Sequence, residues 1–208
     1  VNILVPSQMK KVEQEEVVQR WKKWAVERML QKPELIERLG GKEYTDGQLI
    51  EVGERTYQLQ LKFSDRKTHS GRIIGNRVIE MSLSKSDPAV NKSIRSLLSR
   101  IVAQDYKPEI TRRVLELNHL YFKQPIKSVN LKHNATNWGS CSNKSNLNFS
   151  TRLLFAPQDV IDYVIIHELA HLIELNHSPR FWKLVADAMP EYREKEEWLK
   201  VNRALCEF

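Results

Sequence analysis

The chain has 208 residues, of which 41% are hydrophobic and 28% are charged. This length allows one domain with a sizeable core, or a core domain with a small appendage, and the composition is that of an ordinary soluble protein. No apolar run approaches the roughly 18 residues of a membrane span. The N-terminus has no basic segment followed by a long apolar core, so no signal peptide is predicted.

The cysteine count and the net charge indicate the cellular compartment and the kind of partner. Cys141 and Cys206 are too few for a disulfide framework or a four-cysteine zinc site, which indicates a reducing compartment, and we expect a cytoplasmic protein. The net charge of +7 is compatible with an anionic partner such as a nucleic acid. However, no Lys/Arg run is longer than two residues, and we recognise no nucleic-acid-binding motif in the sequence.

The first part of the chain is predicted to be helical. Residues 8–31 place apolar side chains at helical spacing among many charges, which is typical of an amphipathic helix. Pro33 interrupts this pattern, and a short helix is expected to follow and to end at the Gly40-Gly41 pair. We therefore predict an N-terminal helical appendage at residues 1–45.

A second domain is predicted at residues 46–208, and it begins with strands. Residues 55–63 alternate apolar and polar side chains, as a half-buried strand does, and two more strands are expected to meet in a hairpin at Gly75. A helix of about two dozen residues should follow. Pro108 is expected to separate it from another helix that ends near Phe122.

The remaining elements are predicted from turn and cap signals. Residues 126–151 read as strands, with a turn at 143–146. A long apolar helix is expected after Pro157, another helix at Ser178, and a charged C-terminal helix beyond Pro190.

The apolar helix carries the sequence His-Glu-Leu-Ala-His, beginning at His167. His167 and His171 lie one turn apart on the same helix face, about 40° apart in angle, so both can reach one ion. Glu168 is offset by about 100° and flanks that ion, which suits a base that holds a water. The opposing interpretation is a core helix with two hydrogen-bonded histidines and no metal. We favour the metal, because burying an unpaired Glu–His pair is costly.

A catalytic zinc site needs a third protein ligand and an open position. His177 is out of phase with one continuous helix. However, Asn176 can adopt a left-handed conformation, and Ser178 can cap a new helix that places His177 at a corner facing the ion. The spacing equals that of metzincins, but Glu174 occupies the position of their glycine, so a metzincin fold is not inferred.

Other polar residues near this motif have two interpretations each. Cys141 is either a nucleophile or a small buried side chain, and we favour the second. His133 could hold an oxyanion, Asn148 could orient a ligand, and Glu174 could accept a hydrogen bond from a histidine N–H. For each of these three, an ordinary surface or strand position is the alternative.

Several motifs together resemble those of the YgjP-like metallopeptidase-domain family, a relative of SprT-like and other zincin peptidases. They are Trp138-Gly-Ser-Cys-Ser142, Asn148, the stretch from Leu153 to Trp182, and Met189-Pro-Glu-Tyr192. The resemblance is specific over residues 126–200, looser over 47–90 and absent over the first 45. It implies an α+β, zincin-like fold with an HExxH active-site helix, a backing helix and a small antiparallel sheet whose edge lines the cleft.

The resemblance also implies a site. Its ligands would be His167, His171 and His177, and Glu168 would be the catalytic base. The family usually has arginine where this chain has Asn137, so a substrate contact made by that arginine is not carried over.

Three functions are consistent with this site. The first is a zinc-dependent metallopeptidase, in which Glu168 takes the proton from a zinc-bound water that attacks a peptide carbonyl. An exposed strand edge from residues 137–142 or 147–150 could align the peptide. The second is a metal-dependent nucleotide pyrophosphatase, because the family has been linked to UTP pyrophosphatase activity. The third is a nucleic-acid-associated module with a structural zinc, which a fourth protein ligand would favour.

Overall fold

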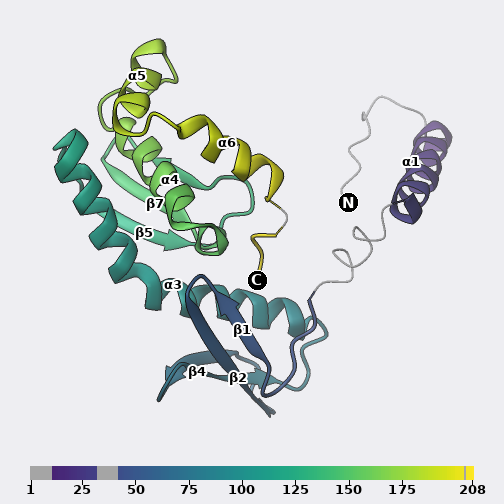
Figure 1. Ribbon diagram of the computed structural model, residues 1–208. Helices are drawn as coiled ribbons and strands as arrows, with labels where there is room; N and C mark the ends of the chain where they lie inside the picture. Colours follow the sequence, from purple (N-terminus) through teal and green to yellow (C-terminus); the bar gives the residue numbers. More distant parts are fainter. Residues whose placement is uncertain (1–10, 32–41, 204) are drawn as a thin grey trace. The chain divides into compact units, whose positions relative to one another are not determined.

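The computed structural model describes residues 11–31, 42–203 and 205–208 (Figure 1). The chain divides into two compact units, residues 1–43 and 44–208. The first unit contains helix α1, Lys11–Gln31, as predicted. The predicted short helix after Pro33 lies outside the described residues.

The second unit begins with a four-stranded sheet in the order β1-β2-β4-β3. Its strands are β1 Leu49–Val52, β2 Arg55–Ser64, β3 Ser70–Ile74 and β4 Val78–Ser84. β3 and β4 form the predicted hairpin, and Gly75 at its turn has φ +50°, a conformation that glycine adopts without strain. β2 and β4 pair in parallel.

Helix α3 runs from Val90 to Leu117 without a break, so the predicted interruption at Pro108 is wrong. Because Pro108 has no N–H, the carbonyl of Gln104 lacks its helical hydrogen bond. The proline ring is exposed and faces solvent. Both flanks of the proline bury apolar side chains in one core, including Tyr106 before it and Ile110 after it. This burial outweighs the lost hydrogen bond. A π-helical turn, Asn118–Phe122, ends the segment.

A second, three-stranded sheet has the order β5-β7-β6. Its strands are β5 Ser128–Lys132, β6 Gly139–Cys141 and β7 Asn146–Ser150. β7 is parallel to β5 and antiparallel to β6. Both sheets are therefore mixed, which corrects the expected small antiparallel sheet. In the first sheet β4 lies between β2 and β3, and in the second sheet β7 lies between β5 and β6. Alternating hydrophobicity does not encode this order.

The remaining helices follow the second sheet. They are the 3₁₀ turn η2 Thr151–Phe155, α4 Gln158–Ala170, α5 Pro179–Ala188 and α6 Tyr192–Val201. Ser178 caps α5 as predicted: its hydroxyl accepts a hydrogen bond from the N–H of Phe181 at 3.3 Å. None of the helices described here is both long enough and apolar enough to cross a bilayer.

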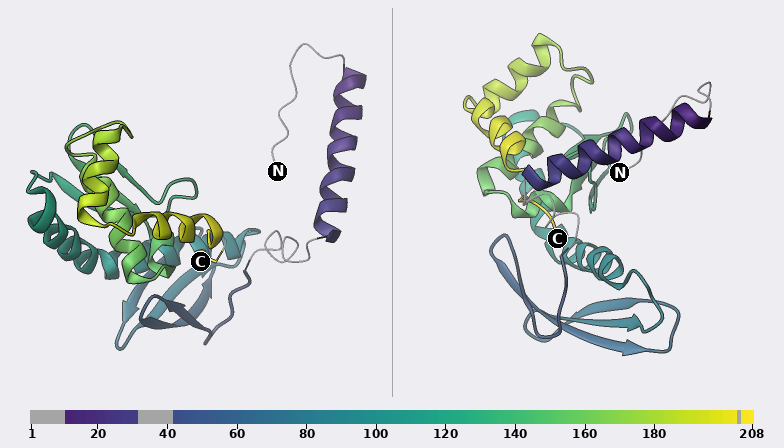
Figure 2. Two further views of the ribbon diagram at one scale, coloured as in Figure 1. Left: turned by 45° about the horizontal axis from the view of Figure 1, so that its top comes forward. Right: turned by 90° about the vertical axis from the view of Figure 1, so that its right-hand side faces the viewer.

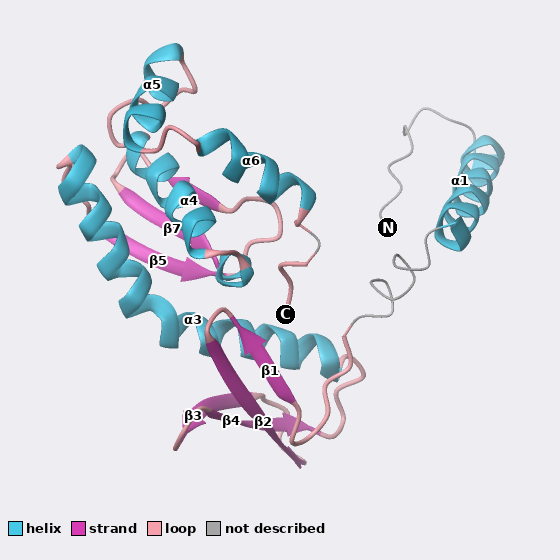
Figure 3. Cartoon of the chain, viewed as in Figure 1, coloured by secondary structure: helices cyan, strands magenta, loops and turns pink. Residues whose placement is uncertain are grey.

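The second unit is an α+β fold in which α3 packs on strands of both sheets (Figures 1 and 2). The two edge strands of the three-stranded sheet have different helix neighbours: α3 contacts β5 (Figure 3), whereas α4 contacts β6. α4 is almost entirely buried, as its run of Val, Ile and Leu predicts. Polar side chains on α4 are therefore placed in an apolar environment beside β6.

Candidate metal centre

The three histidines of the motif converge at the C-terminal end of α4. The helix ends at Ala170, and His171 is its cap residue. The chain then turns through residues 172–178 and brings His177 back. Asn176 is not among the residues with positive φ, so the expected left-handed corner is wrong. The turn is built instead from backbone bonds, such as that from the N–H of Ile173 to the Ala170 carbonyl at 3.0 Å.

The ring nitrogens of these histidines lie close enough to share an ion. One ligand atom from each of His167, His171 and His177 lies within 4.8 Å of the others. The Nε2 atoms of His167 and His177 are 3.0 Å apart. Two nitrogens bound at about 2.1 Å to a tetrahedral zinc are roughly 3.4 Å apart. The spacing of the three rings therefore fits a zinc ion.

The chemistry of the donors fits as well. The pKa of His167 is lowered to about 3, chiefly by burial and also by the neighbouring His171 and His177 rings. Burial also lowers the pKa of His171. Nδ1 of His171 lies 3.1 Å from the backbone carbonyl of Glu174, which leaves Nε2 for an ion. These two rings are thus held neutral, the form that binds metal.

Aromatic side chains surround the histidines. The Phe181 ring stacks on His171 with centroids 4.5 Å apart, and Trp182 stacks on His177 at 5.7 Å. Phe181 is fully buried. These contacts fix the orientation of the rings, while His177 stays exposed to solvent.

Glu168 is buried beside the histidines, with 5% of its surface exposed. Burial raises the pKa of its carboxyl to about 8. The side chain lies against Gly139 of β6, where an added Cβ would lie 2.6 Å from Oε1 and 2.7 Å from Cγ. Glycine is thus the residue that lets α4 and β6 approach closely enough for this placement.

A hollow of about 320 Å³ opens beside Glu168. Its walls include Trp138 before β6, Tyr163 on α4, and Glu196 and Lys200 on α6. Lys200 forms an ion pair with Glu196 at 3.2 Å. The walls are therefore mixed apolar and acidic, with the lysine already paired.

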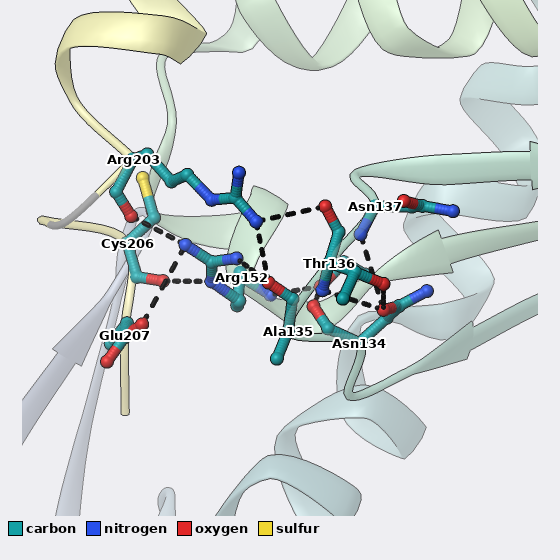
Figure 4. Close-up of polar contacts among 9 residues, drawn as sticks. Asn134, Ala135, Thr136, Asn137, Arg152, Arg203, Cys206 and Glu207 are labelled. Atoms are coloured by element: carbon teal, nitrogen blue, oxygen red, sulfur yellow. Dashed lines mark hydrogen bonds and ion pairs between the residues drawn. The ribbon is translucent and has the colours of Figure 1, made fainter. Parts of the chain in front are cut away.

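The loop that leads into β6 is held by a buried arginine (Figure 4). Arg152 is 3% exposed and donates to the carbonyls of Ala135, Arg203 and Cys206 at 2.6–3.0 Å. Its guanidinium also lies over the Trp138 ring, 4.7 Å from the centroid. Arg152 thus joins the C-terminal segment to the loop that forms one wall of the hollow.

The other residues considered from the sequence lie around this site with different roles. Cys141 is on β6, and burial raises the pKa of its thiol to about 11, with the Glu168 charge adding to the effect. This does not suit a nucleophile. Asn148 donates to the Ser140 hydroxyl at 3.3 Å, and His133 lines a different hollow. Glu174 contacts His171 through its backbone rather than its carboxylate.

Two residues of the site were missed from the sequence. Gly139 stands inside the quoted Trp-Gly-Ser-Cys-Ser motif, and a glycine within a strand is a signal of close backbone approach. Arg152 is an arginine in an otherwise apolar stretch, and such a residue, when buried, requires several acceptors. Those acceptors come from distant parts of the chain, so the sequence pattern could not identify them.

Comparison with known proteins assigns the family. A model of the YgjP-like metallopeptidase domain matches residues 1–202. The chain belongs to this family. The match includes the first 45 residues, where the sequence motifs indicated no resemblance, and so corrects that expectation. Membership gives the chain a metallopeptidase-type domain.

Individual relatives match less of the chain. The UTP pyrophosphatase of Escherichia coli (strain K12) is 27% identical over 99 residues, which are 45% of this chain and 59% of that protein. The chain thus matches about three-fifths of the relative's length.

Two solved structures also show similarity. The metallopeptidase zymogen abylysin of Pyrococcus abyssi is 20% identical, with a TM-score of 0.41 over 44% of this chain and 92% of that one. The zymogen jannalysin of Methanocaldococcus jannaschii is 24% identical, with a TM-score of 0.38 over 46% and 96%. At these scores neither likeness bears on the fold or the function.

Proposed function

We propose that the chain is a zinc-dependent peptidase with a zincin-like catalytic domain at residues 46–208 and an appendage at residues 1–45. In this proposal His167, His171 and His177 hold the ion, and Glu168 is the general base. The observation that carries it is the convergence of three imidazole rings beside one buried carboxyl group. Three side chains are also the number of protein ligands in catalytic zinc sites, whereas structural sites use four.

A zinc ion at this position would lower the pKa of a water molecule and polarise a carbonyl group. The protein's own contribution is proton transfer by Glu168. Burial alone raises the pKa of this carboxyl group to about 8, and a dication bound beside it would favour the ionised form, which can take a proton from water and return it to a leaving amine. Phe181 and Trp182 stack on the rings of His171 and His177 and hold them in position.

The free edge of β6 supports a peptide as substrate. One side of this strand pairs with β7, and in the described part of the sheet its other side has no strand partner. An extended peptide can add to such an edge through backbone hydrogen bonds. Gly139 on this strand touches Glu168, so a peptide paired there would run past the carboxyl group.

A nucleotide pyrophosphatase is the second candidate, because the E. coli relative carries the name UTP pyrophosphatase. Phosphate recognition next to the reacting centre normally uses unpaired Arg or Lys side chains. The hollow beside Glu168 has an acidic residue, Glu196, and its Lys200 is already paired. This lining favours the peptide.

The test compares wild type with Glu168→Gln on panels of peptides and nucleoside triphosphates, after zinc loading. We expect peptide turnover to fall at least about a thousandfold while zinc binding is retained, because the amide cannot accept the proton. Glu174→Gln is the matched control, since only the backbone of Glu174 contacts a ring, and it should keep near wild-type turnover. Hydrolysis of triphosphates but not of peptides would select the second candidate. Turnover by Glu168→Gln equal to that of wild type would show that Glu168 is not the general base.

A further inference from the structure

A second hollow, of about 350 Å³, lies between α3 and β5, at the sheet edge opposite to β6. It shares no lining residue with the hollow beside Glu168. Its volume falls in the range of about 300–1,000 Å³ that small-molecule sites occupy. The lining includes four basic side chains, Arg100, Lys107, Lys132 and His133.

These side chains lie in two rows, one on α3 and one on β5. Arg100, Gln104 and Lys107 are spaced by four and three residues, so they share one face of α3. Asn130 and Lys132 are two residues apart on β5 and therefore point to the same side of the strand. The groove between the rows is thus bordered by hydrogen-bond donors on both sides.

The charge of this groove is not balanced by the protein. None of its lining residues is acidic. In the part of the chain that the structure describes, none of the four basic side chains forms an ion pair, whereas Arg113 pairs with Asp162 at 2.6 Å on the same helix α3. Clustered like charges repel one another, and a bound anion would remove that repulsion.

The donor set indicates phosphate as the anion. Arg binds phosphate oxygens in a bidentate manner, and Lys binds them as a point charge. The amide groups of Gln104 and Asn130 can donate to further oxygens. No Phe, Tyr or Trp side chain lines the groove, and the His133 imidazole is its one aromatic ring, so the lining offers little for a nucleobase to stack on. We propose that this groove binds ligands with two or more neighbouring phosphate groups, which it recognises through the phosphates alone.

Two sources share this chemistry: a small polyphosphorylated molecule and the backbone of a single-stranded nucleic acid. Binding of inorganic tripolyphosphate and of a short oligothymidylate to the full chain is measured by titration calorimetry. EDTA is present, so that no phosphate binds through a metal. Binding of tripolyphosphate assigns the groove to small phosphorylated ligands, and binding of the oligonucleotide alone assigns it to a nucleic-acid backbone.

Paired variants locate the binding. Arg100→Gln/Lys132→Gln removes one charge from each row, and we expect the Kd to rise at least about tenfold. Arg66→Gln/Lys67→Gln removes the same charges from exposed positions between β2 and β3 and should change the Kd less than about twofold. The single change Lys107→Gln, at an exposed helix position, is a second variant and should weaken binding about threefold.

The proposal is overturned if neither ligand binds the wild type, or if the two double variants weaken binding equally. Thermal unfolding of each variant verifies that it is folded. The assay requires no turnover, so its outcome is independent of the proposed peptidase activity.

Discussion

The two edges of the three-stranded sheet provide opposite environments for polar groups. At the β6 edge, Glu168 and His167 project from an apolar helix; Glu168 is buried against Gly139, and His167 packs against the Phe181 ring. At the β5 edge, Arg100 and Lys132 border an open groove and remain exposed. The difference comes from the helix that packs on each edge strand. α4 is apolar on nearly all sides, whereas α3 presents a polar face. One small sheet can thus support a site for chemistry at one edge and a charged surface at the other.

Burial has a cost at only one of these edges. An ionised carboxyl group in an apolar environment is unfavourable, and this raises the pKa of Glu168 to about 8. Such a group persists where function requires it. The exposed cations of the groove require no such compensation, and salt weakens their interactions. We therefore expect substitutions at the β6 edge to change stability and turnover, and those at the β5 edge to change ligand binding alone.

The largest effect on stability is expected from Arg152→Ala. The change leaves the carbonyls of Arg203 and Cys206 without this donor and takes one of two donors from that of Ala135, so the free energy of unfolding should fall by about 3 kcal/mol. Urea unfolding measures this change. Arg203→Ala is the control: this exposed side chain shares the Ala135 carbonyl, and its loss should cost less than about 1 kcal/mol. Equal losses would show that Arg152 does not hold the loop.

A smaller effect, on turnover rather than on stability, is expected from Gly139→Ala. The new Cβ would lie 2.6 Å from Oε1 of Glu168, so the carboxyl group must shift. A displacement of this kind can cost about a hundredfold in rate, and we expect peptide turnover to fall ten- to a hundredfold while zinc binding is retained. Steady-state kinetics with a cleaved peptide provides the measurement.

Ser140→Ala is the matched control for that change. Ser140 follows on the same strand, and its hydroxyl accepts from Asn148 rather than touching Glu168. Turnover within about threefold of wild type is expected, because only a weak 3.3 Å hydrogen bond is lost. Full activity of Gly139→Ala would show that close contact between β6 and Glu168 is not needed.

The sequence predicts the local parts of this site well and the long-range parts poorly. His167 and His171 follow from helical spacing, and the α5 cap at Ser178 follows from cap chemistry; both are local properties. Pro108 was misread because a shared core, formed by residues distant in sequence, holds α3 continuous. Asn176 was misread because the backbone bonds of the turn replace a left-handed residue.

The order of strands was also beyond the sequence pattern. Alternation identifies β5, β6 and β7 as strands but does not say that β7 lies between the other two. This order makes β6 an edge strand, whose Gly139 lies against α4, and it makes β5 the other edge strand, which contacts α3. The contrast between the two edges is thus a property of the tertiary fold.

The central claim is that three histidines hold a zinc ion, and zinc titration of the metal-free protein tests it most directly. We expect one ion per chain, and a loss of affinity of at least about a hundredfold in His171→Ala, because one of three ligands is removed. His119→Ala, which removes an exposed histidine outside the cluster, should bind zinc as the wild type does. Undiminished zinc affinity in His171→Ala would contradict the proposed metal centre.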